Sequence, residues 1–170
     1  PSASSWGHKG FNEFWLNETN DWIYRHLHMA AERMILLAKQ HQQHLLDANK
    51  NDLLSRALHQ AARELLLAQS SDWPFIMRTK TMVDYACSRI KVHLNRFTRL
   101  CEDIQHDTLD TTWLKKIEWQ DEIFNDVNCA LYYLETAQQI QSKDIINSKD
   151  VLSNKEQPVT NSENKERAIL

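Results

Sequence analysis

Tryptophan side chains near the amino terminus are the residues of this sequence with the clearest potential to bind a ligand. Trp6, Trp15 and Trp22 all lie in the segment SSWGHKGFNEFWLNETNDW, which also holds the only two glycines. A flat indole in a loop can stack on the apolar face of a sugar ring while its N–H donates a hydrogen bond to a hydroxyl. Gly7 and Gly10 would let the backbone turn so that the Trp6 ring is presented. Trp22, near the start of a predicted helix, fits the alternative role of filling a core.

Other groupings that could do chemistry are incomplete. His41 and His44 are three residues apart and could share a metal ion, but such pairs near a helix end are usually solvated. A di-iron site needs Glu-x-x-His pairs on facing helices, and no Glu here has His three residues later. GxSxG, P-loop and GxGxxG motifs are missing. Glycoside chemistry needs two carboxylates facing a sugar, and most acidic residues here read as helix-surface charges. The residues alone therefore predict neither a metal site nor a complete catalytic pair.

Apolar periodicity predicts three long helices. The first begins after the capping candidates Asn17, Thr19 and Asn20 and runs to about His44. The second ends near Gln69. Their expected apolar faces are formed by Ile23, Leu27, Ala30, Met34, Leu37 and Ala38, by Leu54, Leu58, Ala61, Leu65 and Ala68, and, on the third, by Met82, Ala86, Ile90, His93, Phe97, Leu100 and Ile104.

Two short helices complete the predicted fold. In SSDWPF, Pro74 is compatible with a helix only in its first turn, where Ser70 or Ser71 would cap it. Asp110 can cap the other short helix. Two glycines and three prolines leave few places for the tight turns of an all-β fold. The predicted fold class is therefore all-α: a helical bundle of three long helices plus short helices, with an ordered N-terminal loop.

Composition limits the partners and the location. A chain of 170 residues that is 42% hydrophobic suits one core. Its net charge of −3 gives no electrostatic case for nucleic acid or a membrane surface, and no apolar run is long enough to span a bilayer. Three cysteines without CxxC spacing indicate a reducing, cytoplasmic setting.

The division of the chain is also predicted from composition. Residues 1–135 would form the helical domain, and the polar residues 136–170 a disordered tail. The sequence starts at Pro1, directly in a motif that looks structured. We therefore expect a piece of a longer protein.

Long segments of the sequence resemble a known family. SSWG, FNEFWLNETNDWIYRHLHMAAERM and RALHQAARELLLAQSSDWPFIM closely resemble the C-terminal helical domain of 1,4-α-glucan branching enzymes of glycoside hydrolase family 57. TMVDYACSRIKVHLNRFTRL continues the match, which runs from about Ser4 to about Phe124. The turn over residues 41–51 is longer than expected for the family, and the tail has no counterpart.

The resemblance implies an enzyme of at least two domains that acts on α-glucan. A barrel-like catalytic domain, N-terminal to the helical one, would supply the nucleophile and the acid/base for a retaining transfer of glucan to a 6-hydroxyl. The helical domain would close one side of the cleft. This chain would then contain no catalytic residue and would be inactive alone. No metal ion or organic cofactor is implied.

The resemblance also assigns candidate substrate-binding residues. Trp6 and Trp15 resemble the aromatic walls that contact the glucan, and Asp72 resembles a substrate-contacting residue. Trp73 and Trp22 are secondary candidates for this role. Aromatic walls would help keep water away from a covalent intermediate. Two alternatives stay open: a non-catalytic helical interaction module, and the same module of a family 57 4-α-glucanotransferase or α-amylase.

A catalytic domain docked on this chain would leave a recognisable surface. Interfaces between domains of one chain commonly bury about 600–1,500 Å². We therefore expect an exposed apolar patch around the N-terminal loop and residues 70–76, including Phe11, Phe14 and Trp73.

Overall fold

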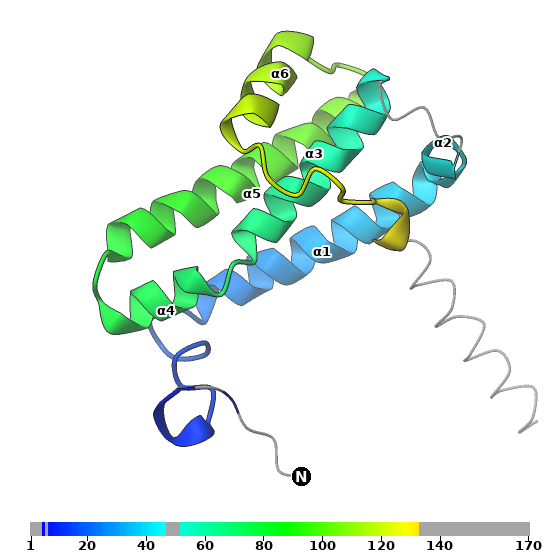
Figure 1. Ribbon diagram of the computed structural model, residues 1–170. Coiled ribbons are helices and arrows are strands. Elements are labelled where there is room, and N and C mark those ends of the chain that lie inside the picture. The colour runs from blue at the N-terminus through cyan, green and yellow to red at the C-terminus, as the bar shows by residue number, and fades with distance from the viewer. Residues whose placement is uncertain (1–4, 6, 47–51, 133–170) are drawn as a thin grey trace, which may run out of the picture. The chain divides into compact units, whose positions relative to one another are not determined.

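The computed structural model describes residues 5, 7–46 and 52–132 (Figure 1). Its elements are a 3-10 turn at His8–Gly10 and the helices α1 (Trp22–Gln40), α2 (Gln42–Leu46), α3 (Leu53–Ala68), α4 (Asp72–Thr79), α5 (Val83–His106) and α6 (Thr111–Gln120). No strand occurs in these residues, so the predicted all-α class is confirmed. Figure 1 shows α1, α3 and α5 side by side, with α6 packed on α3. No helix in the described ranges is long and apolar enough to cross a bilayer.

The predicted apolar faces form the core. All six positions of α1 are buried, and so are four of the five positions of α3, where Leu54 is partly buried. On α5 the prediction is wrong at Met82, whose side chain is 61% exposed. Met82 is the N-cap of α5, with φ −150° and ψ 58°, so it lies outside the helical repeat that buries the other six positions. Beyond α6, Cys129 returns to the core formed by α1, α3 and α5.

The end of the first helix differs from the prediction. Helix α1 ends at Gln40 instead of about His44, because His41 leaves the helical region at φ −105° and ψ 21°. The short helix α2 follows at once. Periodicity could not detect this break, since the sequence on both sides of it favours helix.

The predicted capping residues of α1 have another role. Helix α1 starts at Trp22, after Asp21, which makes no side-chain capping bond. The Asn17 amide oxygen accepts a hydrogen bond from the Thr19 N–H at 3.0 Å, and the Asn20 amide oxygen accepts one from the Asn17 N–H at 2.9 Å. These residues therefore shape the turn that precedes the helix.

Aspartates cap two later helices. Asp110 accepts hydrogen bonds from the N–H groups of Thr112 and Trp113 at 2.9 and 3.0 Å, as predicted. Asp52 accepts bonds from the Ser55 N–H at 3.0 Å and the Ser55 hydroxyl at 2.8 Å. Both carboxylate oxygens of Asp52 therefore accept hydrogen bonds from the first turn of α3.

The Asp52 cap makes the stability of the fold depend on pH. Burial raises the pKa of this carboxyl, but the bonds from Ser55 and from His44, at 2.9 Å, outweigh that effect and lower the pKa from 3.8 to about 2. A carboxyl whose pKa is depressed by folding contributes stability above its unfolded pKa. The contribution is therefore lost as the pH falls from about 4 to about 2.

We expect Asp52→Asn, which keeps a capping oxygen but removes the charge, to lower the free energy of unfolding at pH 6 by less than Asp52→Ala. The alanine variant should lose about 0.5–2 kcal/mol. Urea unfolding at pH 6 and pH 2.5 tests the charge effect, because the difference between wild type and Asp52→Asn should shrink at the lower pH. Asp126→Asn, at an exposed carboxylate, is the control. A difference that stays constant with pH would contradict the explanation.

Candidate functional site

The N-terminal loop is attached to α4 through the side chain of Asn20. This amide is fully buried, and its NH₂ group donates to the carbonyl oxygens of Phe14, at 2.9 Å, and Pro74, at 3.1 Å. The Phe14 ring also stacks on the Phe75 ring, with centroids 5.3 Å apart and planes 21° from parallel. Asn20 thus joins two segments that are 54 residues apart and carry the predicted site residues Trp15 and Asp72.

Trp15 is half-buried in this loop, and its backbone is held on both sides. Its N–H donates to the Asn12 carbonyl at 3.0 Å, and its carbonyl accepts a hydrogen bond from the Tyr24 hydroxyl. Its ring meets the Phe14 ring edge-on, with centroids 6.1 Å apart. The indole is therefore a fixed aromatic surface that solvent still reaches.

A residue larger than glycine would be strained at position 7, because of both its backbone conformation and the aromatic rings close to it. Its φ of +110° is one that residues with a side chain rarely adopt, and a Cβ atom there would lie 3.0 Å from Phe14 Cδ2 and 3.4 Å from Trp15 Cζ3. Gly10 also has a positive φ, 72°, and its carbonyl accepts a bond from the Ser5 N–H at 2.9 Å, which closes the turn. Trp6, the central prediction for this loop, lies outside the described residues.

Asp72 is exposed at the first position of α4. Its carboxylate accepts one long hydrogen bond, from the Ser70 hydroxyl at 3.3 Å, and its N–H donates to the same hydroxyl at 3.4 Å. Ser71 occupies the N-cap position but makes no capping bond, so of the two predicted caps only Ser70 contributes. The Asp72 carboxylate is therefore accessible, and its charge is favourable at a helix N-terminus.

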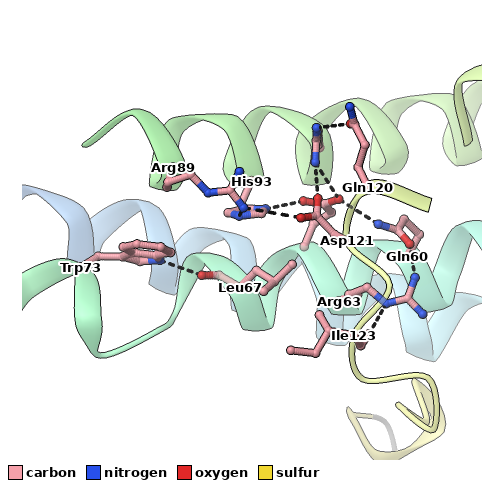
Figure 2. A network of polar contacts seen from close by, with 11 residues as sticks. Gln60, Arg63, Leu67, Trp73, Arg89, His93, Gln120, Asp121 and Ile123 are labelled. Carbon is pink, nitrogen blue, oxygen red and sulfur yellow. Dashed lines mark hydrogen bonds and ion pairs between the residues drawn. The ribbon is translucent and has the colours of Figure 1, made fainter. Parts of the chain in front are cut away.

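Trp73 and Trp22 have clear packing roles. The Trp73 indole N–H donates to the Leu67 carbonyl at 2.8 Å (Figure 2), and its ring meets the Tyr85 ring edge-on. Trp22 packs against the core and meets His26 edge-on. It also lines a groove of about 500 Å³ between α1 and α5.

Of the three residues expected to form an exposed apolar patch, only one is largely exposed. Phe11 is 71% exposed, as expected for an interface residue. Phe14 and Trp73 are only partly exposed, because the first stacks on Phe75 and the second packs between Leu67 and Tyr85. Apolar side chains that are more exposed lie nearby in sequence, at Leu16, Met82, Val83 and Tyr85.

A buried polar network lies between α3 and α5 (Figure 2). Glu64 and His93 are both fully buried, and His93 Nδ1 lies 2.6 Å from a Glu64 carboxylate oxygen. Arg89 donates to His93 Nε2 at 2.9 Å. A guanidinium can only donate, so Nε2 accepts, and Nδ1 carries the proton that is shared with Glu64. The Gln60 amide donates to the other Glu64 oxygen at 2.8 Å.

This network extends to the segment that follows α6. Arg96 pairs with Asp121 and lies 3.7 Å from Glu64, and Arg89 lies 3.5 Å from Asp121. Glu64, His93 and Asp121 offer ligand atoms within 4.8 Å of one another, a spacing that a metal ion could use. The two guanidinium groups already contact all three of these side chains, and they would repel another cation. The donor set therefore fits an ion-pair network better than a metal centre.

The sequence analysis does not predict the roles of the buried polar residues Asn20, Gln60 and Glu64. The sequence predicts a capping role for Asn20 and indicates no role for Gln60 or Glu64. A signal is present in the sequence, because Gln60 and Glu64 are four residues apart and each directly precedes a predicted apolar position, Ala61 or Leu65. Polar side chains that are buried beside such positions need hydrogen-bond partners.

Comparisons with known proteins agree with this architecture. The family model described as 1,4-alpha-glucan branching enzyme, C-terminal, matches residues 26–132. The 1,4-alpha-glucan branching enzyme TK1436 of Thermococcus kodakarensis is 28% identical over 141 residues, which are 81% of this chain and 20% of that protein. The chain thus spans about a fifth of that relative's length.

Solved structures of larger proteins also contain a part that is similar to this chain. The GH57-type branching enzyme from Pyrococcus horikoshii has a TM-score of 0.67 and 33% identity over 76% of this chain and 24% of that one. TK1436 in complex with glucose and additives has a TM-score of 0.68 and 28% identity over 76% of this chain and 23% of that one. The alpha-amylase AmyC from Thermotoga maritima has a TM-score of 0.57 and 46% identity over 69% of this chain and 22% of that one.

The predicted resemblance is therefore confirmed. The family model covers more than half of the chain, and the helical fold matches that of the solved relatives over three quarters of its length. This chain belongs to the family of C-terminal domains of 1,4-alpha-glucan branching enzymes of glycoside hydrolase family 57.

Proposed function

We propose that this chain is the C-terminal module of a 1,4-α-glucan branching enzyme, in which it lines the active-site cleft and helps to position the glucan for transfer to a 6-hydroxyl. The main support is the Asn20 amide, which ties the loop carrying Trp15 to the helix carrying Asp72. An aromatic face and an exposed carboxylate on joined segments suit a sugar, since the ring can stack and its hydroxyls can donate hydrogen bonds.

The chemistry itself is assigned to another domain of the same protein. A retaining transfer needs a nucleophile and an acid/base placed on either side of the glycosidic bond. We assign both carboxylates to an N-terminal catalytic domain, and we expect the 170-residue chain alone to form no α-1,6 linkages. Trp6 and Trp15 would shield the covalent intermediate from water and orient the acceptor glucan. We propose no metal ion or organic cofactor for this step.

A cytoplasmic location is proposed from the three cysteines. Cys87, Cys101 and Cys129 are all free thiols. Burial raises the pKa of Cys101 to about 11 and that of Cys129 to about 12, so these two thiols are poorly reactive. Free thiols at buried positions are usual in a reducing compartment.

One relative favours a second candidate function. AmyC, at 46% identity, is described as an alpha-amylase. A module with the same residues could therefore position α-glucan for hydrolysis instead of transfer. Assaying the protein that contains this chain with amylose separates the two activities, because a branching enzyme forms α-1,6 linkages whereas an amylase only releases reducing ends. A protein with no activity on α-glucan would leave the non-catalytic interaction module.

Trp15→Ala tests the aromatic wall in the protein that contains this chain. We expect branch formation to fall roughly tenfold, because the acceptor loses its orientation, while hydrolysis falls less, since water is its acceptor. Trp6→Ala should act in the same direction. The measurement is the ratio of α-1,6 linkages to reducing ends, with a melting curve for each variant.

A matched control is Trp113→Ala. Trp113 is also partly buried, but it lies on α6 with the Arg99 guanidinium 3.9 Å from its ring centroid. This variant should lose stability without a change in the product ratio. A ratio that is equal in wild type and Trp15→Ala, with a lowered melting temperature, would show that Trp15 only packs the loop.

Asp72→Asn tests the carboxylate. Asp72 is exposed and α4 has no side-chain capping bond from its N-cap, so we expect the melting temperature to stay nearly unchanged while activity on glucan falls. Asp110→Ala provides the opposite control, because it removes two capping bonds from α6 and should cost about 0.5–2 kcal/mol of stability with activity retained. Normal activity with a large melting shift in Asp72→Asn would contradict the proposed role.

A further inference from the structure

Trp119 is the most exposed large apolar side chain among the described residues, at 78%. It lies one residue before the end of α6, whose core side is formed by Leu114 and Ile117. The indole makes no ring contact and no hydrogen bond with another described residue. Packing among the described residues therefore does not explain a tryptophan at this position.

Arginines from α3 and α5 contact residues on both sides of Trp119, mostly through the side chains of those residues. The contacts are Arg56 with Glu118, Arg96 with Gln120 at 2.6 Å and with Asp121, and Arg63 with the Ile123 carbonyl at 2.6 Å. Figure 2 shows Arg63, Gln120, Asp121 and Ile123 in this arrangement. A surface fixed before binding loses less conformational entropy when a ligand arrives.

A shallow pocket of about 360 Å³ adjoins the indole. It is lined by Arg63, Lys115, Glu118, Trp119, Glu122 and Asn125. Two of these side chains are basic and two are acidic, so the lining favours a neutral ligand over an ion. Lys115, Glu122 and Asn125 are exposed and make no hydrogen bond or ion pair with another described residue. They can therefore both donate to and accept from hydroxyl groups.

The lining argues against a protein partner at the same place. The exposed apolar side chains nearby, Ile123 and Phe124, do not line the pocket. The core of a protein–protein interface is depleted in charged residues, whereas four of the six lining residues here are charged. One aromatic face surrounded by mixed donors and acceptors fits a sugar ring better.

We infer that Trp119, with Lys115, Glu122 and Asn125, forms a second contact for α-glucan, here called the α6 surface. The identity of the ligand rests on the proposed function, whereas the site itself rests on the exposed indole and its polar surroundings. Figure 1 shows α6 on the far side of the bundle from α4 and the N-terminal loop. A long glucan held at the α6 surface would stay near the enzyme between transfers, which raises its effective concentration at the cleft.

The test uses the protein that contains this chain, run on native gels with and without glycogen. We expect Trp119→Ala to weaken retardation by glycogen roughly two- to tenfold, the loss expected for one aromatic contact. Trp119→Phe should restore most of it, and Asn125→Ala should weaken it less. Leu36→Ala, at an exposed apolar position on α1, is the matched control and should bind as wild type does.

The outcomes separate this inference from the proposed function. If wild type and Trp119→Ala are equally retarded, and both act on amylose, the α6 surface is not a glucan site although the proposed function stands. If wild type is not retarded and has no activity on α-glucan, both proposals fail. A lowered melting temperature in Trp119→Ala would show that the ring packs against another part of the protein, and would also overturn the inference.

Discussion

The buried contact between Glu64 and His93 fixes how α3 and α5 face each other. A carboxylate in a protein interior is costly unless donors surround it, and here His93, Gln60 and the nearby Arg96 supply them. This requirement selects one register for the two central helices, since a slip of either would leave the charge unpaired. Arg96, which lies near Glu64, also pairs with Asp121. The position of the chain after α6 therefore also depends on the buried pair.

Both surfaces that are proposed to contact glucan are supported by polar contacts between segments that are distant in the sequence. At one end, the buried Asn20 amide bonds two carbonyl groups from distant segments and so holds the loop on α4. On α6, arginines contact the side chains of Glu118 and Gln120 and the Ile123 carbonyl, on both sides of Trp119. In each case polar contacts between distant segments position a segment that carries an aromatic ring within reach of solvent. Binding residues often lie on loops that a rigid scaffold positions.

Short-range patterns predicted much of the fold. The apolar repeat located the buried face of α1 at all six positions, and the Asp110 cap followed from local spacing. Contacts between distant residues could not be predicted, such as Glu64 with His93 or Asn20 with Pro74, because no local pattern encodes the partner. For the site, the sequence indicated Trp15 and Asp72 only through the family resemblance. Trp6 and residues 136–170 lie outside the described part of the chain, so their roles stay predictions.

The most direct test of the central claim is a crystal structure of the protein that contains this chain, bound to a maltooligosaccharide. Our account predicts a glucose ring stacked on the indole of Trp15 and a sugar hydroxyl within hydrogen-bond distance of the Asp72 carboxylate. Asn20 should keep its bonds to the Phe14 and Pro74 carbonyls in that complex, since the loop is already held in place. An oligosaccharide that occupies the catalytic cleft while Trp15 and Asp72 touch no sugar would contradict the account.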